Sequence, residues 1–290
     1  MLETVSVSPA LAPMVDASAL LDDIAAALRA GRLIPYVGPG VYAASGVEAS
    51  APTTPEEVAA ALNKRAAAPG RIRNNMWGVA QFIEQRRHRK TLTAFMADIF
   101  KEPVSPTPLH RALAKLTGLP LIVDVWYDSA MREALAGRAD WLEVQGVSRA
   151  LEFTDIWHKS YDSSGAEMSA AAVAGQKTLL YKPHGGVTPA QNFLVADSDY
   201  VEVLTEIDIQ TPIPAPVKEI RASRGFVFLG CRFYDQMLRA YARQIAKHSA
   251  GPHYILVGPE TLTRNEVKFL KEMNLVVVKA PLSDLVERLT

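Results

Sequence analysis

The stretch FVFLGCRFYDQMLRAYARQIAKHSAGPHYILV, residues 226–257, decides the fold. It opens with an apolar run over 226–229, passes through a helical pattern over 234–248, and ends in a second apolar run over 254–257. Strands that alternate with helices of this length are typical of parallel βαβ units. The apolar runs have no polar side, as expected of a parallel sheet that is covered on both faces. The alternation continues with a helix, a strand and a helix over 262–272, 275–278 and 281–289.

The N-terminal half adds two expected strands, over 33–37 and 119–125. Between them the apolar spacing predicts helices over 55–66, 74–86, 89–100 and 108–116. The sequence therefore predicts an α/β protein with a Rossmann-like parallel sheet flanked by helices, into which a helical cap is inserted at about 55–117. We expect residues 1–17 to form a flexible leader and residues 18–290 to form one domain.

The composition argues against some classes of binding partner. The 290 residues contain 31 Lys and Arg against 31 Asp and Glu, so a net charge of zero gives no general attraction to nucleic acid or to an anionic membrane. Apolar stretches are too short to span a bilayer, and residues 1–18 lack the basic region of a secretory signal, so we expect a cytoplasmic protein. Cys231 is the single cysteine, which excludes an internal disulfide and a cysteine-based zinc site, and we expect no metal.

The first glycine-bearing turn is GPGVYA, residues 38–43, which follows an expected strand and fits the pattern G-x-G-x-x-A. Such a turn lets the backbone approach a pyrophosphate, with nearby N–H groups as donors. Pro39 removes one of those donors. A plain turn at the end of a strand would use Gly38 and Gly40 equally well, and this alternative stays open.

The second turn is YKPHGG, residues 181–186. His184 follows an apolar run and precedes two glycines, at the carboxyl edge where sheets of this class bind ligands. A neutral imidazole at this position can accept a proton from a ribose hydroxyl. The alternative is an ordinary loop histidine beside flexible glycines.

The third turn is FLGCRFYD, residues 228–235. Gly230 allows a ligand to approach the edge of the sheet, and Asp235 can cap the next helix. We expect Cys231 to be a small buried residue rather than a nucleophile. Arg232 is a candidate phosphate contact, and a solvated loop arginine is the alternative.

The ordered set of these turns resembles the sirtuin-like family, in particular its prokaryotic NAD-consuming branch. That branch has a GAG-S loop, a T-T-N-Y-D segment, a K-x-H-G segment and an F-x-G-x-S-x-x-D segment. The corresponding segments here are GPGVY at 38–42, DVWYD at 124–128, KPHG at 182–185 and FLGCRFYD at 228–235. The resemblance implies a Rossmann-like fold that binds NAD, with His184 as the retained base.

The resemblance also implies the residues that face the nucleotide, which are Gly38, Gly40, Val41, Tyr42, Trp126, Gly185, Gly230, Cys231 and Arg232. Trp126 stands where the family has an asparagine, and an indole offers one N–H donor and no acceptor. Asp124 and Asp128 flank it and are the candidates, with His184, for a catalytic role. The chain lacks the four-cysteine zinc module of protein deacylases, which argues against protein deacylation.

Two functions remain open. The first is hydrolysis of NAD to ADP-ribose and nicotinamide, with His184 as base. The alternative is a non-catalytic sensor or scaffold that binds NAD or ADP-ribose, which the departures at Pro39, Trp126 and Arg232 motivate. Hydride transfer ranks last, because the acidic residue expected about 20 positions after the glycines is missing from a second strand. The basic run at 85–90 is interpreted as a solvated helix end, and assembly into a homo-oligomer is left open.

Overall fold

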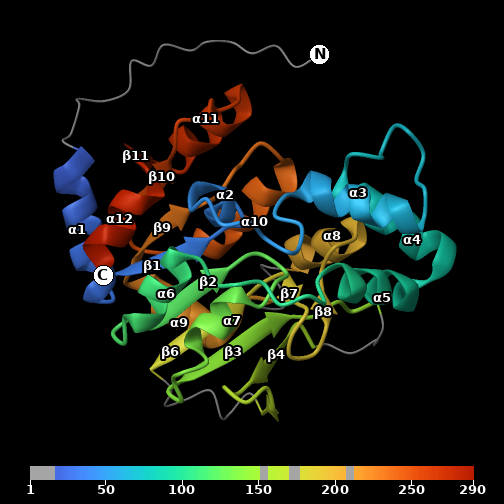
Figure 1. The fold of residues 1–290 in the computed structure, drawn as a ribbon, viewed down its shortest axis with the longest axis horizontal. Helices are drawn as coiled ribbons and strands as arrows, with labels where there is room; N and C mark the ends of the chain where they lie inside the picture. The colour runs from blue at the N-terminus through green and yellow to red at the C-terminus, as the bar shows by residue number, and fades with distance from the viewer. Residues whose placement is uncertain (1–16, 151–155, 170–176, 207–211) are drawn as a thin grey trace.

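The computed structural model describes residues 17–150, 156–169, 177–206 and 212–290. Its core is a sheet with the strand order β11-β10-β9-β1-β2-β6-β3-β4-β5, shown in Figure 1. The strands from β11 to β3 are parallel, and β4 and β5 extend one edge in antiparallel pairing. The strand bounds are β1 (Leu33–Val37), β2 (Leu121–Asp124), β3 (Trp141–Gly146), β4 (His158–Tyr161), β5 (Glu167–Met168), β6 (Thr178–Lys182), β9 (Gly225–Leu229), β10 (His253–Val257) and β11 (Leu275–Lys279).

Helices cover both faces of this sheet. One face carries α1, α12, α6 and α7, which pack against one another in that order. The other face carries α9, α10 and α11, which are joined by Arg221 of α9 donating to the carbonyl oxygens of Gln244 and Ile245, and by an ion pair between Arg243 and Glu272. The bounds are α1 (Ala17–Arg29), α6 (Pro108–Lys115), α7 (Ala130–Leu135), α9 (Ala215–Ala222), α10 (Gln236–Ala246), α11 (Arg264–Glu272) and α12 (Leu282–Leu289).

A second group of helices lies beside the carboxyl edge of the sheet, at the right of Figure 1. It consists of α3 (Pro55–Arg65), α4 (Met76–Arg87) and α5 (Arg89–Ile99), which pack on one another, and α8 (Asp197–Glu206), which packs on α4 and α10. Thr54 caps α3 by accepting a hydrogen bond from the Glu57 N–H. α6 lies within the range expected for the cap, but it packs on α7 and α12 against the sheet.

The predicted α/β fold with a Rossmann-like parallel sheet is confirmed, and the strand expected over 33–37 has the same bounds as β1. The short helix α2 (Val41–Ala44), directly after the first glycine turn, was not expected from the sequence. The two-stranded ribbon of β7 (Gly185–Gly186) and β8 (Asn192–Phe193), and the helices α8 and α9, were not expected from the sequence. β7 and β8 have two residues each, which is too short for a periodic pattern. The leader expected over 1–17 lies outside the described residues except for Ala17, which is the first residue of α1.

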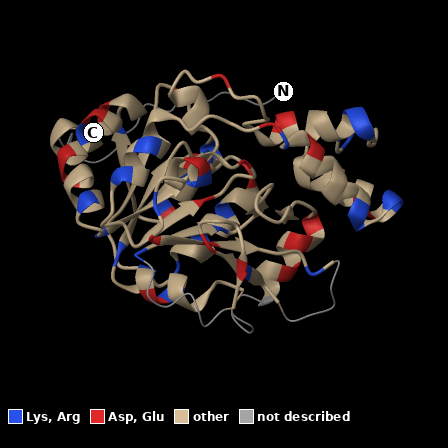
Figure 2. Ribbon diagram, turned by 60° about the horizontal axis from the view of Figure 1, so that its bottom comes forward, with Lys and Arg blue, Asp and Glu red and all other residues tan. Residues whose placement is uncertain are grey.

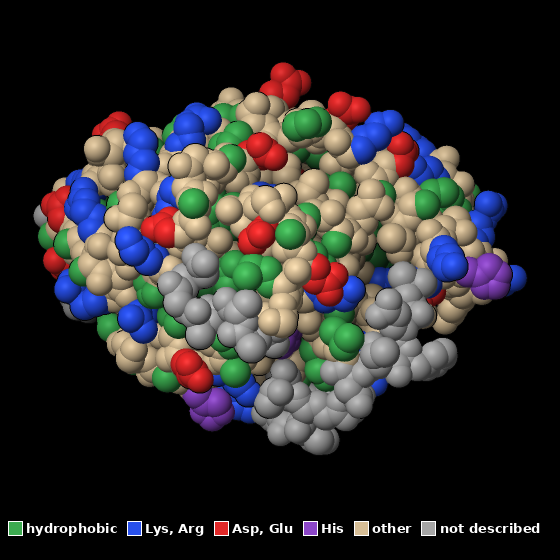
Figure 3. Space-filling model, turned by 90° about the horizontal axis from the view of Figure 1, so that it is seen from below, with side chains coloured by type: hydrophobic (Ala, Val, Ile, Leu, Met, Phe, Trp, Pro, Cys, Tyr) green, Lys and Arg blue, Asp and Glu red, His purple; other side chains and the backbone are tan. Residues whose placement is uncertain are grey.

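Figure 2 shows that charged residues of both signs are distributed over the helices and loops. The face shown in Figure 3 likewise has Lys, Arg, Asp and Glu side chains interspersed with apolar ones. This mixing accompanies a net charge of zero. Within the described ranges, no helix is long and apolar enough to cross a membrane.

Candidate functional site

The order of the strands reverses between β1 and β9. Strands β2, β6 and β3 lie on one side of β1, and β9, β10 and β11 lie on the other. In open α/β sheets, ligands bind outside the carboxyl ends of the strands at such a switch point. Gly38 directly follows β1 and Gly230 directly follows β9, so the two glycine turns flank this point.

The two glycine turns contact each other directly. The N–H of Gly40 donates to the Gly230 carbonyl at 2.9 Å, and the N–H of Gly38 donates to the Leu229 carbonyl at 2.9 Å. A Cβ on Gly38 would lie 2.6 Å from the Gly230 oxygen, and one on Gly230, where φ is 63°, would lie 2.4 Å from the Val41 nitrogen. These glycines are therefore needed for close packing of the turns, and the N–H groups of Gly38 and Gly40 are already paired.

Tyr42 follows the first turn and is buried, as is Val41. Within the described part of the chain its hydroxyl has no hydrogen-bond partner. Burial raises the pKa of Tyr42, and the carboxylates of Asp128 and Asp124 raise it further. Its ring centroid lies 5.8 Å from that of His110 on α6. A buried phenol thus faces two carboxylates at the end of β2.

Asp124, the last residue of β2, forms a buried ion pair with Lys182, the last residue of β6. The Lys182 Nζ lies 2.6 Å from Oδ2 of Asp124 and donates to the Asp128 carbonyl at 3.0 Å. Burial raises the pKa of Asp124 to about 6, although the Lys182 charge opposes this shift. The Asp128 side chain accepts a hydrogen bond from the Ala130 N–H at 2.8 Å, at the start of α7. Both carboxylates therefore belong to the same edge of the sheet as the glycine turns.

His184 is buried among aromatic rings, with 3% of its surface exposed. Its Nδ1 lies 3.1 Å from the Tyr200 hydroxyl, and its ring centroid lies 4.5 Å from that of Tyr241. Burial lowers the pKa of His184 to about 3, and the Lys182 charge contributes. The imidazole is therefore neutral at pH 7, which is the form that can accept a proton.

Gly185 follows His184 with a φ of 71°, and a Cβ there would lie 2.1 Å from the Asn192 oxygen. Its position in the ribbon of β7 and β8 therefore requires glycine. This ribbon turns the chain back directly after the histidine, and the Leu194 N–H donates to the His184 carbonyl at 3.0 Å.

The other expected site residues have partners inside the protein. The Trp126 indole donates to the Pro52 carbonyl at 2.7 Å. The Arg232 guanidinium binds both oxygens of Glu266 on α11, at 2.7 and 2.9 Å. Burial raises the pKa of the Cys231 thiol, so this cysteine is present as the unreactive thiol.

Tyr200, Tyr241 and His110 were missed by reasoning from the sequence. They come from α8, α10 and α6, and no motif spacing relates them to His184. The helical pattern over 234–248 does place Tyr241 on a buried face together with Ile245. That pattern indicates burial of Tyr241, but it does not indicate which side chain the ring contacts.

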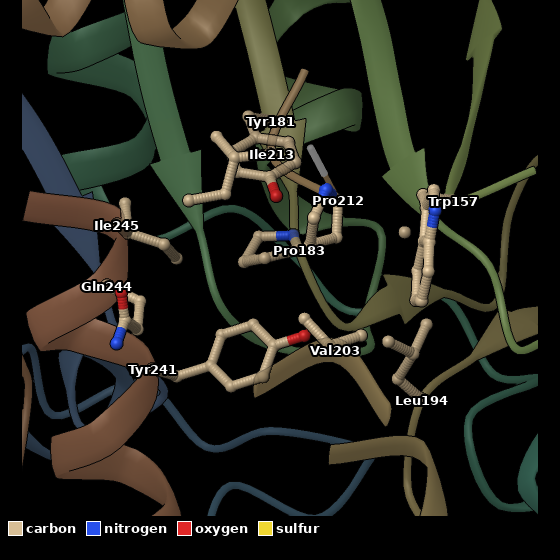
Figure 4. Close-up of a pocket in the computed structure, with 11 residues that line it drawn as sticks. Trp157, Tyr181, Pro183, Leu194, Val203, Pro212, Ile213, Tyr241, Gln244 and Ile245 are labelled. Carbon is tan, nitrogen blue, oxygen red and sulfur yellow. The ribbon is translucent and has the colours of Figure 1, made fainter. Parts of the chain in front are cut away.

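A hollow of about 10 Å³, with room for about one water molecule, lies against Tyr181, Pro183 and Tyr241 (Figure 4). Most of its wall is apolar and includes Trp157 and Ile213. It is far smaller than the ~300–1,000 Å³ of ligand pockets, so it does not by itself hold a nucleotide. Among the described residues, no group of three His, Cys, Asp or Glu side chains is placed to hold a metal ion.

Two comparisons with known proteins found matches. A family model described as a SIR2-like domain matches residues 120–278, more than half of the chain. Among solved structures, one titled "Structural Basis for the Mechanism and Regulation of Sir2 Enzymes" is 14% identical, with 93% of this chain and 96% of that chain covered and a TM-score of 0.37. No curated protein matches the chain. The range of the family model includes Asp124, Lys182, His184 and Gly230.

Proposed function

We propose that this chain, which belongs to the SIR2-like domain family, binds NAD at the carboxyl edge of its sheet and hydrolyses it to ADP-ribose and nicotinamide. The observation that carries the proposal is His184, a neutral imidazole two residues after β6, whose last residue, Lys182, binds the buried Asp124. The resemblance to sirtuin-like proteins supports NAD as the ligand.

Hydrolysis of NAD breaks the bond between nicotinamide and ribose, adds water, and releases one proton. His184 accepts a proton from a ribose hydroxyl or from the attacking water. As nicotinamide leaves, positive charge develops on the ribose, and the carboxylates of Asp124 and Asp128 stabilise it. Asp124 is partly neutralised by Lys182, so Asp128 contributes more of this effect.

Access to His184 requires a side chain to move, since Tyr241 covers the ring. The residues we propose to face the nucleotide are the two glycine turns, with Gly185, Trp126, Cys231 and Arg232. For Arg232 this contact requires exchange of its Glu266 partner.

Release of nicotinamide from NAD by the purified full-length chain tests the proposal. We expect the variant His184→Gln, which cannot act as a base, to lose a factor of about 10²–10⁴ in kcat. Tyr254→Phe, on the distant strand β10, is a matched control that should keep the wild-type rate. Binding of NAD without any release of nicotinamide would contradict hydrolysis.

A sensor or scaffold that binds NAD or ADP-ribose without turnover is the second candidate. The covered His184 favours it, because the imidazole has to be exposed before it can act as a base. The departures from the family pattern at Pro39, Trp126 and Arg232 favour it as well. Thermal unfolding with a panel of nucleotides measures binding alone, and a ligand at about 100 times its Kd adds about 2.7 kcal/mol to the free energy of unfolding. If no nucleotide stabilises the chain, both candidates fail.

We also propose a cytoplasmic location and a helical cap inserted at about 55–117, within which α6 packs against the sheet. A homo-oligomer is a further proposal, which sedimentation of the full chain tests. No membrane or nucleic-acid partner is proposed, and a nucleotide is the ligand.

A further inference from the structure

His184 is the first member of a chain of buried hydrogen bonds. Its Nδ1 lies 3.1 Å from the Tyr200 hydroxyl, which lies 3.4 Å from the Tyr127 hydroxyl. The Tyr127 hydroxyl in turn donates to the Leu194 carbonyl at 2.8 Å. All four residues are at most 3% exposed, so water does not compete for these groups.

The end of this chain fixes its direction. A carbonyl oxygen only accepts, so the single proton of the Tyr127 hydroxyl is used on Leu194. The Tyr127 oxygen can then only accept from Tyr200, which uses the single proton of the Tyr200 hydroxyl. The Tyr200 oxygen is left to accept from Nδ1–H of His184. The reverse direction, with Tyr200 donating to Nδ1, leaves no proton between the two tyrosine oxygens and makes one hydrogen bond fewer.

We infer that Tyr200 and Tyr127 are positioning residues that hold His184 in the Nδ1–H tautomer, with the lone pair on Nε2. The tautomer of a histidine is set by the hydrogen bond that its other nitrogen makes. No described residue forms a hydrogen bond with Nε2, so this atom is left to act as the base. The role of Nε2 as a base rests on the proposed NAD hydrolysis, whereas the assignment of the tautomer does not.

The two tyrosines come from different elements. Tyr127 follows β2, Tyr200 lies on α8, and Leu194 follows β8. The tautomer of His184 therefore depends on how α8 packs beside the sheet. A hydrogen-bonded neighbour of this kind acts on the reaction through the histidine and does not contact the substrate.

Nitrogen NMR of ¹⁵N-histidine protein in the absence of ligand tests the tautomer. The chain has 6 histidines, and the signals of His184 are those that disappear in His184→Gln. We expect wild-type His184 to be protonated at Nδ1. In Tyr127→Phe, Tyr200 loses its acceptor and can donate to Nδ1, so the proton should move to Nε2. Tyr241→Phe, which removes a hydroxyl outside the chain of hydrogen bonds, should leave the wild-type tautomer.

Protonation of wild-type His184 at Nε2 would overturn the inference, and so would an Nδ1–H tautomer that persists in both Tyr127→Phe and Tyr200→Phe. The wild-type spectrum tests the tautomer even if Tyr127→Phe or Tyr200→Phe does not fold. Kinetics add a second measurement: Tyr127→Phe should lower kcat at least about tenfold while KM stays within about threefold, because Nε2 no longer accepts a proton. If the tautomer is as expected but NAD is not cleaved, the proposed function fails and the tautomer assignment stands.

Discussion

Lys182 and His184 are two positions apart in the sequence, and the interior of the protein shifts their pKa values in opposite directions. Burial lowers the pKa of Lys182, but the carboxylates of Asp124, Asp128 and Glu143 outweigh burial and raise it. His184 has no such carboxylate partner, so burial and the Lys182 charge together lower its pKa. The site therefore contains a charged lysine and a neutral histidine at pH 7.

Removal of the lysine from the buried Lys182–Asp124 pair tests the interaction of Lys182 with its carboxylate partner. In Lys182→Met, Asp124 is left as a buried carboxylate without its cation, so the free energy of unfolding should fall by about 3–5 kcal/mol. Urea unfolding at pH 7 measures the loss. The double variant Lys182→Met/Asp124→Asn should recover part of it, and Lys101→Met, at an exposed pair, should cause no measurable change. An equal loss in the single and double variants would contradict this account.

The pH dependence of stability tests the lowered pKa of His184. The pKa of His184 is about 3 in the folded protein and 6.5 ordinarily, so between these values the folded state binds fewer protons than the unfolded state. Its contribution to stability is complete above pH 6.5 and is lost as the pH falls. From pH 7 to pH 5, wild type should lose about 2 kcal/mol more than His184→Gln in urea unfolding. The raised pKa of Asp124 acts in the opposite direction, but it is common to both proteins. Parallel pH profiles would show that His184 titrates normally.

At the scale of elements, two contacts determine the shape of the site. The turns after β1 and β9 pack backbone against backbone through Gly38, Gly40 and Gly230. On the other side, α8 is connected to α5 and to β8, because Arg89 of α5 binds both Asp199 of α8 and the Phe193 carbonyl of β8. The first contact joins the turns that follow β1 and β9, and the second holds Tyr200 beside His184.

The glycine contact predicts a large effect of one methyl group. In Gly230→Ala, the Cβ would lie 2.4 Å from the Val41 nitrogen at a φ of 63°, so we expect a loss of more than about 2 kcal/mol in the free energy of unfolding. Gly137→Ala adds the same methyl group where no atom lies within 4 Å, and it should be close to neutral. Thermal unfolding of both variants makes the comparison. Equal melting temperatures would mean that the turns separate easily.

The Arg89 contact predicts how firmly α8 is held. Arg89 Nη1 lies 2.8 Å from Asp199, and both side chains are buried, so Arg89→Met should raise amide hydrogen exchange in α8 at least about tenfold. The exposed Arg87, two residues before it, provides the control Arg87→Met, which should leave exchange unchanged. Unaltered protection of α8 in Arg89→Met would show that other contacts hold the helix.

At the scale of the whole molecule, the sheet joins residues that are far apart in the chain. β1 pairs with β2 on one side and with β9 on the other, so a strand from the N-terminal region lies in the middle of the core. The range of the SIR2-like family model, 120–278, does not include β1. The family match therefore covers the site residues from Asp124 to Gly230 but lacks one central strand of the fold.

This arrangement predicts that the fragment 120–290 does not fold alone, because β2 and β9 would each lose their pairing with β1 and expose apolar edges. We expect no cooperative thermal transition for the fragment by circular dichroism. Co-expression with the fragment 1–119, which carries β1, is the matched control and should restore a transition. A cooperative transition of 120–290 at the melting temperature of the full chain would contradict the prediction.

The sequence by itself determined the alternation of strands and helices, and with it the parallel sheet and the carboxyl edge at which Gly38, His184 and Gly230 lie. It could do so because the hydrophobic pattern of a strand or helix is local, and a residue that ends a parallel strand falls at a known edge. Only the tertiary structure decided that Tyr127 and Tyr200 join His184 in one chain of hydrogen bonds.

The tertiary structure also decided that Arg232 binds Glu266, 34 residues later, and that Tyr241 covers the imidazole of His184. These contacts join side chains from α8, α10 and α11 to the ends of strands, and no spacing in the sequence encodes them. Their geometry follows from how the helices pack on the sheet. Side chains from distant segments are close-packed there, and their contacts determine which hydrogen bonds form and how the pKa values shift.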